Sequence, residues 1–230
     1  MVELVIIIPA RGGSTRILRK NVKIFNGAPM IHWPISAALG CVSPENVIVS
    51  TEDREIAEVA ASAGASVPFI RPAELADDQA GTAPAIVHAL DALEIADDTA
   101  AMCLYPTAPV PSSTLAAALV LAEEHPDDFV ISVGRHRSPH ERSVVPGGEG
   151  RMVLADSTAL FSRTQDLPER YFDAGKFYVA SAATWRSRTT MMAEPFMPFF
   201  LPDWATIDMD EPDDWPVAEA LHRAFVLEDG

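Results

Sequence analysis

Short, nearly continuous apolar runs alternate with longer amphipathic segments through the first two-thirds of this sequence. Runs of this kind are typical of parallel strands that are buried on both faces, and segments with a 3.6-residue period are typical of the helices that join them. Such strands place ligands at the carboxyl edge of the sheet. The pattern predicts an α/β fold with three layers (αβα) and a mostly parallel sheet, with strands over Leu4–Ile8, Asn46–Ser50, Val67–Ile70, Ala101–Tyr105 and Phe129–Val133.

Helices are expected between these strands and at the end of the chain. Their predicted positions are after Asp53, from Thr82 toward Leu93, from a Ser112 or Ser113 cap toward His125, and after Pro212 with Val217, Leu221, Ala224 and Phe225 on one face. The alternation ends after Val133, and Pro146–Gly150 predicts a loop or a hairpin turn. A length of 230 residues suits a single domain, 1–230, with an inserted region over about 134–175.

The formal net charge of −16 argues against partners such as nucleic acid or an anionic membrane. The first 23 residues reverse this balance, since their basic residues are Arg11, Arg16, Arg19, Lys20 and Lys23 and their one acid is Glu3. Such an island is either a small-anion site or a solvated loop. The opening apolar run is too short for a membrane span, no signal leader precedes it, and the two cysteines form no CxxC pattern. We therefore expect a cytoplasmic protein.

A glycine-rich loop, Pro9–Arg16, follows the first predicted strand directly. Adjacent glycines let backbone N–H groups approach an anion, and arginines add charge-assisted donors for phosphate oxygens. Neither a dinucleotide GxGxxG pattern nor a P-loop is present. The loop alone is consistent with a phosphate site or with a plain turn.

Two carboxylates near the C-terminus, Asp208 and Asp210, point to the same side of an extended segment. A divalent cation relieves their repulsion, and Mg²⁺ suits a site with few protein carboxylates and phosphate oxygens. A solvated acidic face is the alternative. Asp213 and Asp214 are explained by their place in the first turn of the last helix.

The segment IIIPARGGSTRILRKN resembles the opening signature of the CMP-sialic acid synthetase family, especially its pseudaminic acid cytidylyltransferase branch. The matching residues are Ala10, Arg11, Gly13, Ser14, Lys20 and Asn21. Two positions depart from the family pattern, because Thr15 stands where lysine is usual and Leu18 where proline is usual. Arg16 is our candidate substitute for the missing lysine.

Further segments resemble the same family in the same order: STED at 50–53, RPAELADD at 71–78, LYPTAP at 104–109, SRTQDLPERYFDAGKFYVA at 162–180 and IDMDEPDDW at 207–215. Lys176 stands where the family commonly has glutamine. His136, Arg137, His140 and Arg142, in a stretch with poor resemblance, form a basic group that either meets an acidic sugar or lines a solvated loop.

The resemblance implies a Rossmann-like sheet of the nucleotide-diphospho-sugar transferase type. It implies transfer of CMP from CTP to a nine-carbon α-keto acid sugar, with pseudaminic acid favoured and N-acetylneuraminate or legionaminate as alternatives. It also implies Mg²⁺ and a homodimer. A CTP-binding relative with impaired catalysis is the other alternative, and the general base is left open between Asp210 and a metal-held hydroxide.

The candidate site residues fall into three groups. Those expected to act in catalysis are Arg11, Ser14, Arg16, Lys20 and Asp210. Those expected to bind the nucleotide are Ala10, Arg11, Gly12, Gly13, Asn21, Arg71, Asp77, Tyr105 and Thr107. Those expected to hold the metal are Asp208 and Asp210.

Overall fold

A computed structural model describes residues 4–76, 81–158, 160–188 and 190–227. Its centre is a six-stranded sheet in the order β10-β6-β9-β5-β1-β4. The β1 strand pairs in parallel with β4 and β5, and β10 pairs in parallel with β6, whereas β9 is antiparallel to both β5 and β6. The strands are β1 (Leu4–Pro9), β4 (Val47–Ser50), β5 (Ala100–Leu104), β6 (Phe129–Arg135), β9 (Tyr171–Ser181) and β10 (Phe196–Phe200).

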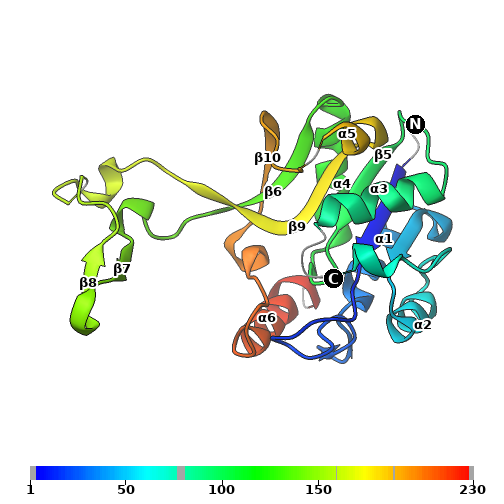
Figure 1. The fold of residues 1–230 in the computed structure, drawn as a ribbon, viewed down its shortest axis with the longest axis horizontal. Helices are drawn as coiled ribbons and strands as arrows, with labels where there is room; N and C mark the ends of the chain where they lie inside the picture. Colours follow the sequence, from blue (N-terminus) through cyan, green and yellow to red (C-terminus); the bar gives the residue numbers. More distant parts are fainter. Residues whose placement is uncertain (1–3, 77–80, 159, 189, 228–230) are drawn as a thin grey trace.

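Helices cover both faces of this sheet (Figure 1), so the prediction of a three-layer, mostly parallel α/β fold is confirmed. One face packs against α1 (His32–Leu39), α2 (Arg54–Ser62) and α4 (Ser112–Glu124). The other packs against α3 (Thr82–Ala92) and α5 (Ala182–Ser187). A smaller cluster joins the last helix, α6 (Asp214–His222), to the short strands β2 (Ile24–Phe25) and β3 (Ala28–Pro29).

The predicted strand Val67–Ile70 is wrong. Only Ser66 bridges to Ile48, and the following residues leave the sheet. Pro68 lies in this run and has no N–H to donate to a ladder. The chain instead turns toward the site, where the Arg71 N–H donates to the Thr51 carbonyl at 2.9 Å.

Two details of the predicted helices are also wrong. Ser112 is the first residue of α4 and not its cap; Pro111 holds the cap position without a side-chain hydrogen bond. The buried face of α6 carries Trp215, Ala218 and His222, while Val217 is 51% exposed. The aromatic contacts of Phe25 with Trp215 and His222 favour this face over the aliphatic stripe.

Residues 136–170 form an arm that extends away from the body of the molecule (Figure 1). Its tip is the hairpin of β7 (Val144–Pro146) and β8 (Met152–Leu154), with a turn at Gly147–Gly150. Gly134–Arg135 and Tyr171–Gly175, which the predicted inserted region included, belong instead to strands of the central sheet. None of the described helices is long and apolar enough to cross a membrane.

Candidate functional site

A cavity of about 440 Å³ opens at the carboxyl edge of the parallel strands. Its walls come from the loop after β1, from Arg71 in the segment that follows β4, and from Tyr105–Thr107 after β5. Because β9 runs antiparallel, its first half brings Gly175 to the same edge. The segment before α6 closes the cavity with Asp208 and Asp210.

The loop after β1 is held by side-chain contacts to residues that follow β4. Arg19, with a positive φ of 55°, pairs with Asp53 at 2.5 Å and with Glu55. Asp53 also accepts the Ile56 N–H at 3.0 Å, as the N-cap of α2. Arg19 is the largest cause that lowers the pKa of Asp53, to about 2. One carboxylate therefore fixes both the helix start and the basic loop.

Glu52 contacts the glycine-rich part of the loop. Its Oε1 accepts the Gly12 N–H at 2.7 Å, and its Oε2 accepts from Arg71 Nη2 at 2.7 Å. Gly12 also approaches Asp53 so closely that an added Cβ would lie 2.4 Å from Asp53 Oδ2. The Gly12 N–H, expected to face a phosphate, is thus directed at a carboxylate. Close packing against Asp53 explains why glycine stands at position 12.

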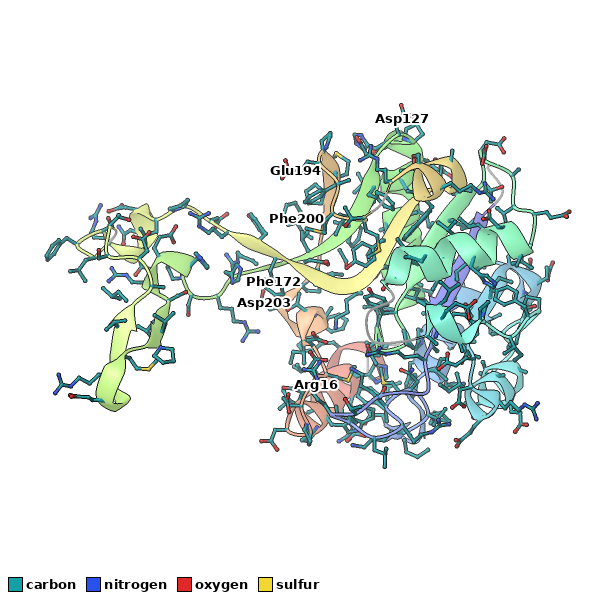
Figure 2. The ribbon with its side chains drawn as sticks, viewed as in Figure 1. Arg16, Asp127, Phe172, Glu194, Phe200 and Asp203 are labelled. Carbon is teal, nitrogen blue, oxygen red and sulfur yellow. The ribbon has the colours of Figure 1, made fainter. Side chains whose placement is uncertain are left out.

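Asp210 lies between two cations of the basic loop. Arg16 Nη2 is 2.9 Å from Asp210 Oδ2, and Lys20 Nζ is 3.5 Å from Oδ1. Asp210 is the largest cause that raises the pKa of Arg16. Lys20 also donates to the Met209 carbonyl at 2.8 Å. Figure 2 labels Arg16 beside the start of the C-terminal helix, where these contacts join the two ends of the chain.

Lys176 is a buried lysine directly behind the carboxylate segment. Its side chain is 3% exposed, and Nζ donates to the Ile207 carbonyl at 2.6 Å. Burial lowers the pKa of Lys176 to about 8, while the charge of Asp208 acts in the opposite direction. Nearby, the hydroxyls of Thr82 and Tyr105 lie 2.7 Å apart, and burial raises the pKa of Tyr105.

Most of the predicted site residues line this one cavity: Arg11, Ser14, Arg16, Lys20, Asn21, Arg71, Tyr105, Thr107, Asp208 and Asp210. Ala10, Gly12 and Gly13 do not line it; Ala10 is fully buried and donates to the Ser50 carbonyl at 2.9 Å. Asp77 lies outside the described residues. The basic group His136, Arg137, His140 and Arg142 is also absent from the cavity wall, and Arg137 pairs with Asp203 at 3.3 Å.

Sequence reasoning missed Thr82 and Gly175 as cavity residues. Thr82 was assigned only to a helix start, although its position one residue after Gly81 and before Pro84 signals a loop-to-helix transition at the strand edge. Gly175 has a φ of 58°, which favours glycine, and its side of β9 faces Tyr105. The family resemblance of the segment 162–180, which contains Gly175, was the available signal for it.

Known proteins of one family resemble this chain over most of its length. The family model for cytidylyltransferases matches residues 5–202, a range that ends before Asp208. A pseudaminic acid cytidylyltransferase of Campylobacter jejuni subsp. jejuni is 32% identical over 220 residues, covering 94% of this chain and 95% of the relative. A CMP-N,N'-diacetyllegionaminic acid synthase of Legionella pneumophila is 28% identical over 225 residues, covering 95% and 96%.

Among solved structures, the chain resembles CMP:2-keto-3-deoxy-manno-octonic acid synthetase complexed with CTP, with a TM-score of 0.68 and 18% identity over 96% of this chain and 99% of that one. This likeness supports the fold. The family model and the curated relatives, which span nearly the whole chain, support more. The chain belongs to the cytidylyltransferase family, within its CMP-sialic acid synthetase group, and is a nucleotidyltransferase.

Proposed function

We propose that this chain transfers CMP from CTP to the anomeric hydroxyl of a nine-carbon α-keto acid sugar, pseudaminic acid, and releases pyrophosphate. The observation that carries the proposal is the meeting of four cationic side chains and a carboxylate pair in one cavity at the sheet edge. The cations are Arg11, Arg16, Lys20 and Arg71. The name of the Campylobacter jejuni relative favours pseudaminic acid, and that of the Legionella pneumophila relative makes a legionaminic acid the second candidate acceptor.

The cations of the cavity suit the triphosphate. Arginine and lysine donate charge-assisted hydrogen bonds to phosphate oxygens, and they stabilise the charge that develops on the leaving pyrophosphate. Ser14 adds a hydroxyl donor on the same loop. Tyr105 and Thr107, across the cavity, are proposed to face the cytosine and the ribose.

Asp208 and Asp210 are proposed to hold Mg²⁺. The described residues contain no cluster of three or more metal-ligating side chains, so a metal here would take two carboxylates and complete its shell from phosphate and water. That donor set is the one Mg²⁺ commonly uses. When bound, the ion would neutralise charge on the α-phosphate and orient it.

The remaining step is an in-line attack by the sugar hydroxyl on the α-phosphorus, with the bond to the pyrophosphate oxygen breaking. Among the described residues that line the cavity, the carboxylates are Asp208 and Asp210. Of these two, Asp210 is our candidate for accepting the hydroxyl proton. The protein contributes mainly positioning and electrostatic stabilisation.

The test is pyrophosphate release from CTP and Mg²⁺ with pseudaminic acid, N,N'-diacetyllegionaminic acid, N-acetylneuraminic acid or no sugar. Release that requires pseudaminic acid, with CMP-sugar formed in equal amount, is the expected result. Release with a different sugar would overturn the acceptor but keep the reaction. CTP binding without pyrophosphate release with any of the sugars would support the other alternative, a CTP-binding relative with catalysis impaired at Thr15.

The arm supports the further proposal of a homodimer. Val144, Val145, Met152 and Val153 of the hairpin are 43–57% exposed, and Phe161 is 96% exposed. Apolar side chains gathered on a projecting element are typical of an interface. Light scattering after size exclusion should give twice the mass of the 24.8 kDa chain.

A cytoplasmic location stays a prediction.

A further inference from the structure

Lys176 occupies a position that is costly for a cation. It comes from the middle of β9, its side chain is 3% exposed, and fully buried lysines are rare because removing an ammonium group from water is unfavourable. Among the described residues, its side chain donates to a backbone carbonyl, that of Ile207, and pairs with no carboxylate. A cavity of about 20 Å³, lined in part by Lys176, Ile207 and His222, has room for one water.

The carboxylate segment has few bonds of its own. Residues 207–210 lie between the last 3-10 turn, Asp203–Thr206, and α6, outside any strand. Among the described residues, no backbone–backbone hydrogen bond of a turn, loop or cap involves residues 207–210. Side chains hold the segment instead: Lys176 bonds the Ile207 carbonyl, Lys20 bonds the Met209 carbonyl, and Asp214 accepts the Asp210 N–H at 3.0 Å.

The two lysines hold carbonyls on either side of Asp208. They come from elements far apart in the sequence, the loop after β1 and the strand β9. Lys20 Nζ also lies 3.5 Å from Asp210 Oδ1. The two hydrogen bonds set the position of the segment at the cavity wall.

We propose that Lys176 is a positioning residue for the reaction: its hydrogen bond to the Ile207 carbonyl fixes Asp208 and Asp210 in the geometry that binds the divalent cation. This rests on the proposed function, in which the two aspartates hold the metal. Lys176 touches neither the nucleotide nor the sugar in this assignment. Its effect reaches the metal through the backbone of one residue, as groups beyond the first ligand shell act in metal sites.

The test compares Lys176→Met, which removes both the donor and the charge at similar volume, with Lys176→Gln, which keeps an amide donor. Lys23→Met is the matched control, because Lys23 packs over Trp215 and does not line the cavity. Mn²⁺ binding to each full-length variant is titrated by electron paramagnetic resonance. The Mg²⁺ concentration for half-maximal activity is measured at saturating CTP.

We expect Lys176→Met to weaken Mn²⁺ binding and to raise the half-maximal Mg²⁺ concentration by about tenfold or more, with kcat at saturating Mg²⁺ reduced much less. Lys176→Gln should recover part of this loss, and Lys23→Met should match the original chain. The melting temperature of Lys176→Met should change little, because the loss of the hydrogen bond to the Ile207 carbonyl and the relief from burying an ammonium group act in opposite directions.

Wild-type Mn²⁺ affinity in both Lys176 variants would overturn the assignment while leaving the proposed reaction intact. Equal losses in the methionine and glutamine variants would show that charge acts and not the hydrogen bond, which also overturns it. If the original chain bound no Mn²⁺ and needed no divalent cation for turnover, the proposed metal site itself would fail, and Lys176 would have nothing to position.

Discussion

The Arg16 guanidinium lies 2.9 Å from Asp210 Oδ2, so a predicted phosphate ligand and a predicted metal ligand are paired with each other. Lys20 faces the other oxygen of the same carboxylate. A cation that binds Asp210 must compete with Arg16, whereas a triphosphate offers Arg16 another anionic partner. Metal and nucleotide should therefore each strengthen the binding of the other.

Replacing Arg16 by methionine should tighten Mn²⁺ binding in the absence of nucleotide. The gain should be about two- to fivefold, because an exposed ion pair is worth at most about 1 kcal/mol. Calorimetric or resonance titration of Mn²⁺ measures it, with Arg54→Met on the exposed start of α2 as the control. Unchanged affinity in Arg16→Met would show that the pair does not compete with the metal.

Restoring lysine at position 15 tests whether Arg16 has replaced it. Thr15 and Arg16 both line the cavity, so a lysine at 15 would enter the same space. We expect Thr15→Lys to change kcat by less than about threefold, Arg16→Ala to lower it about 100-fold, and the double variant to recover part of the loss. Steady-state pyrophosphate release is the measurement. A gain above tenfold in Thr15→Lys alone would mean that Arg16 does not compensate.

Asparagine at either Asp208 or Asp210 should lower kcat by about 100- to 1000-fold, because it removes a charged ligand from the proposed metal site. The fold should remain, since each change also relieves repulsion between neighbouring carboxylates. Turnover and circular dichroism are measured together. Asp213→Asn is the matched control, because Asp213 makes no side-chain cap bond and does not line the cavity. Equal turnover in all three variants would remove the aspartate pair from the mechanism.

The two glycines of the loop should respond differently to alanine. A Cβ at Gly12 would lie 2.4 Å from Asp53 Oδ2, whereas a Cβ at Gly13 would meet nothing within 4 Å. We expect Gly12→Ala to lower the free energy of unfolding by about 1–3 kcal/mol and Gly13→Ala to leave it nearly unchanged. Urea denaturation measures both. A raised KM for CTP in Gly13→Ala would indicate that the nucleotide needs the close approach that Gly13 allows.

Asp53 should stabilise the fold in a pH-dependent way. Its pKa is lowered to about 2, chiefly by Arg19, so its stabilisation is present above its ordinary pKa of 3.8 and is lost as the pH falls toward 2. Asp53→Asn, which keeps a capping side chain, should cost about 1–2 kcal/mol near pH 7 and progressively less below about pH 4. Glu55→Gln, at the more exposed end of the same contact, should cost less. A gap between Asp53→Asn and the original chain that does not narrow in acid would contradict this assignment.

Local patterns were sufficient for the layers of the fold and for the edge at which the cavity opens. The apolar runs at Leu4 and Phe129 became strands because burial on both faces leaves little other choice. Strand direction was not predictable in the same way. The β9 strand was not predicted at all, because its run carries Asp173, Gly175 and Lys176 and is less apolar than β1 or β5. Its connection to β6 through the arm makes it antiparallel.

The contacts that complete the site depend on long-range packing. Lys176 and Ile207 are 31 residues apart, and Lys20 and Met209 are 189 apart. A pattern read from a single sequence does not show which residues this far apart along the chain come into contact. The resemblance placed Lys20 and Asp208 in one site, but the burial of Lys176 and the capture of the Gly12 N–H by Glu52 follow only from the folded chain.

The arm begins and ends at neighbouring residues. Arg135 and Tyr171 are paired across β6 and β9, and the His136 N–H donates to the Arg170 carbonyl at 3.0 Å. Topologically, residues 136–170 are thus an enlarged hairpin loop, and a turn of a few residues would close the same two strands. Evolution can lengthen, shorten or replace this loop without altering the register of a single strand in the sheet. Under the proposed homodimer, the surface for assembly can therefore change independently of the catalytic edge.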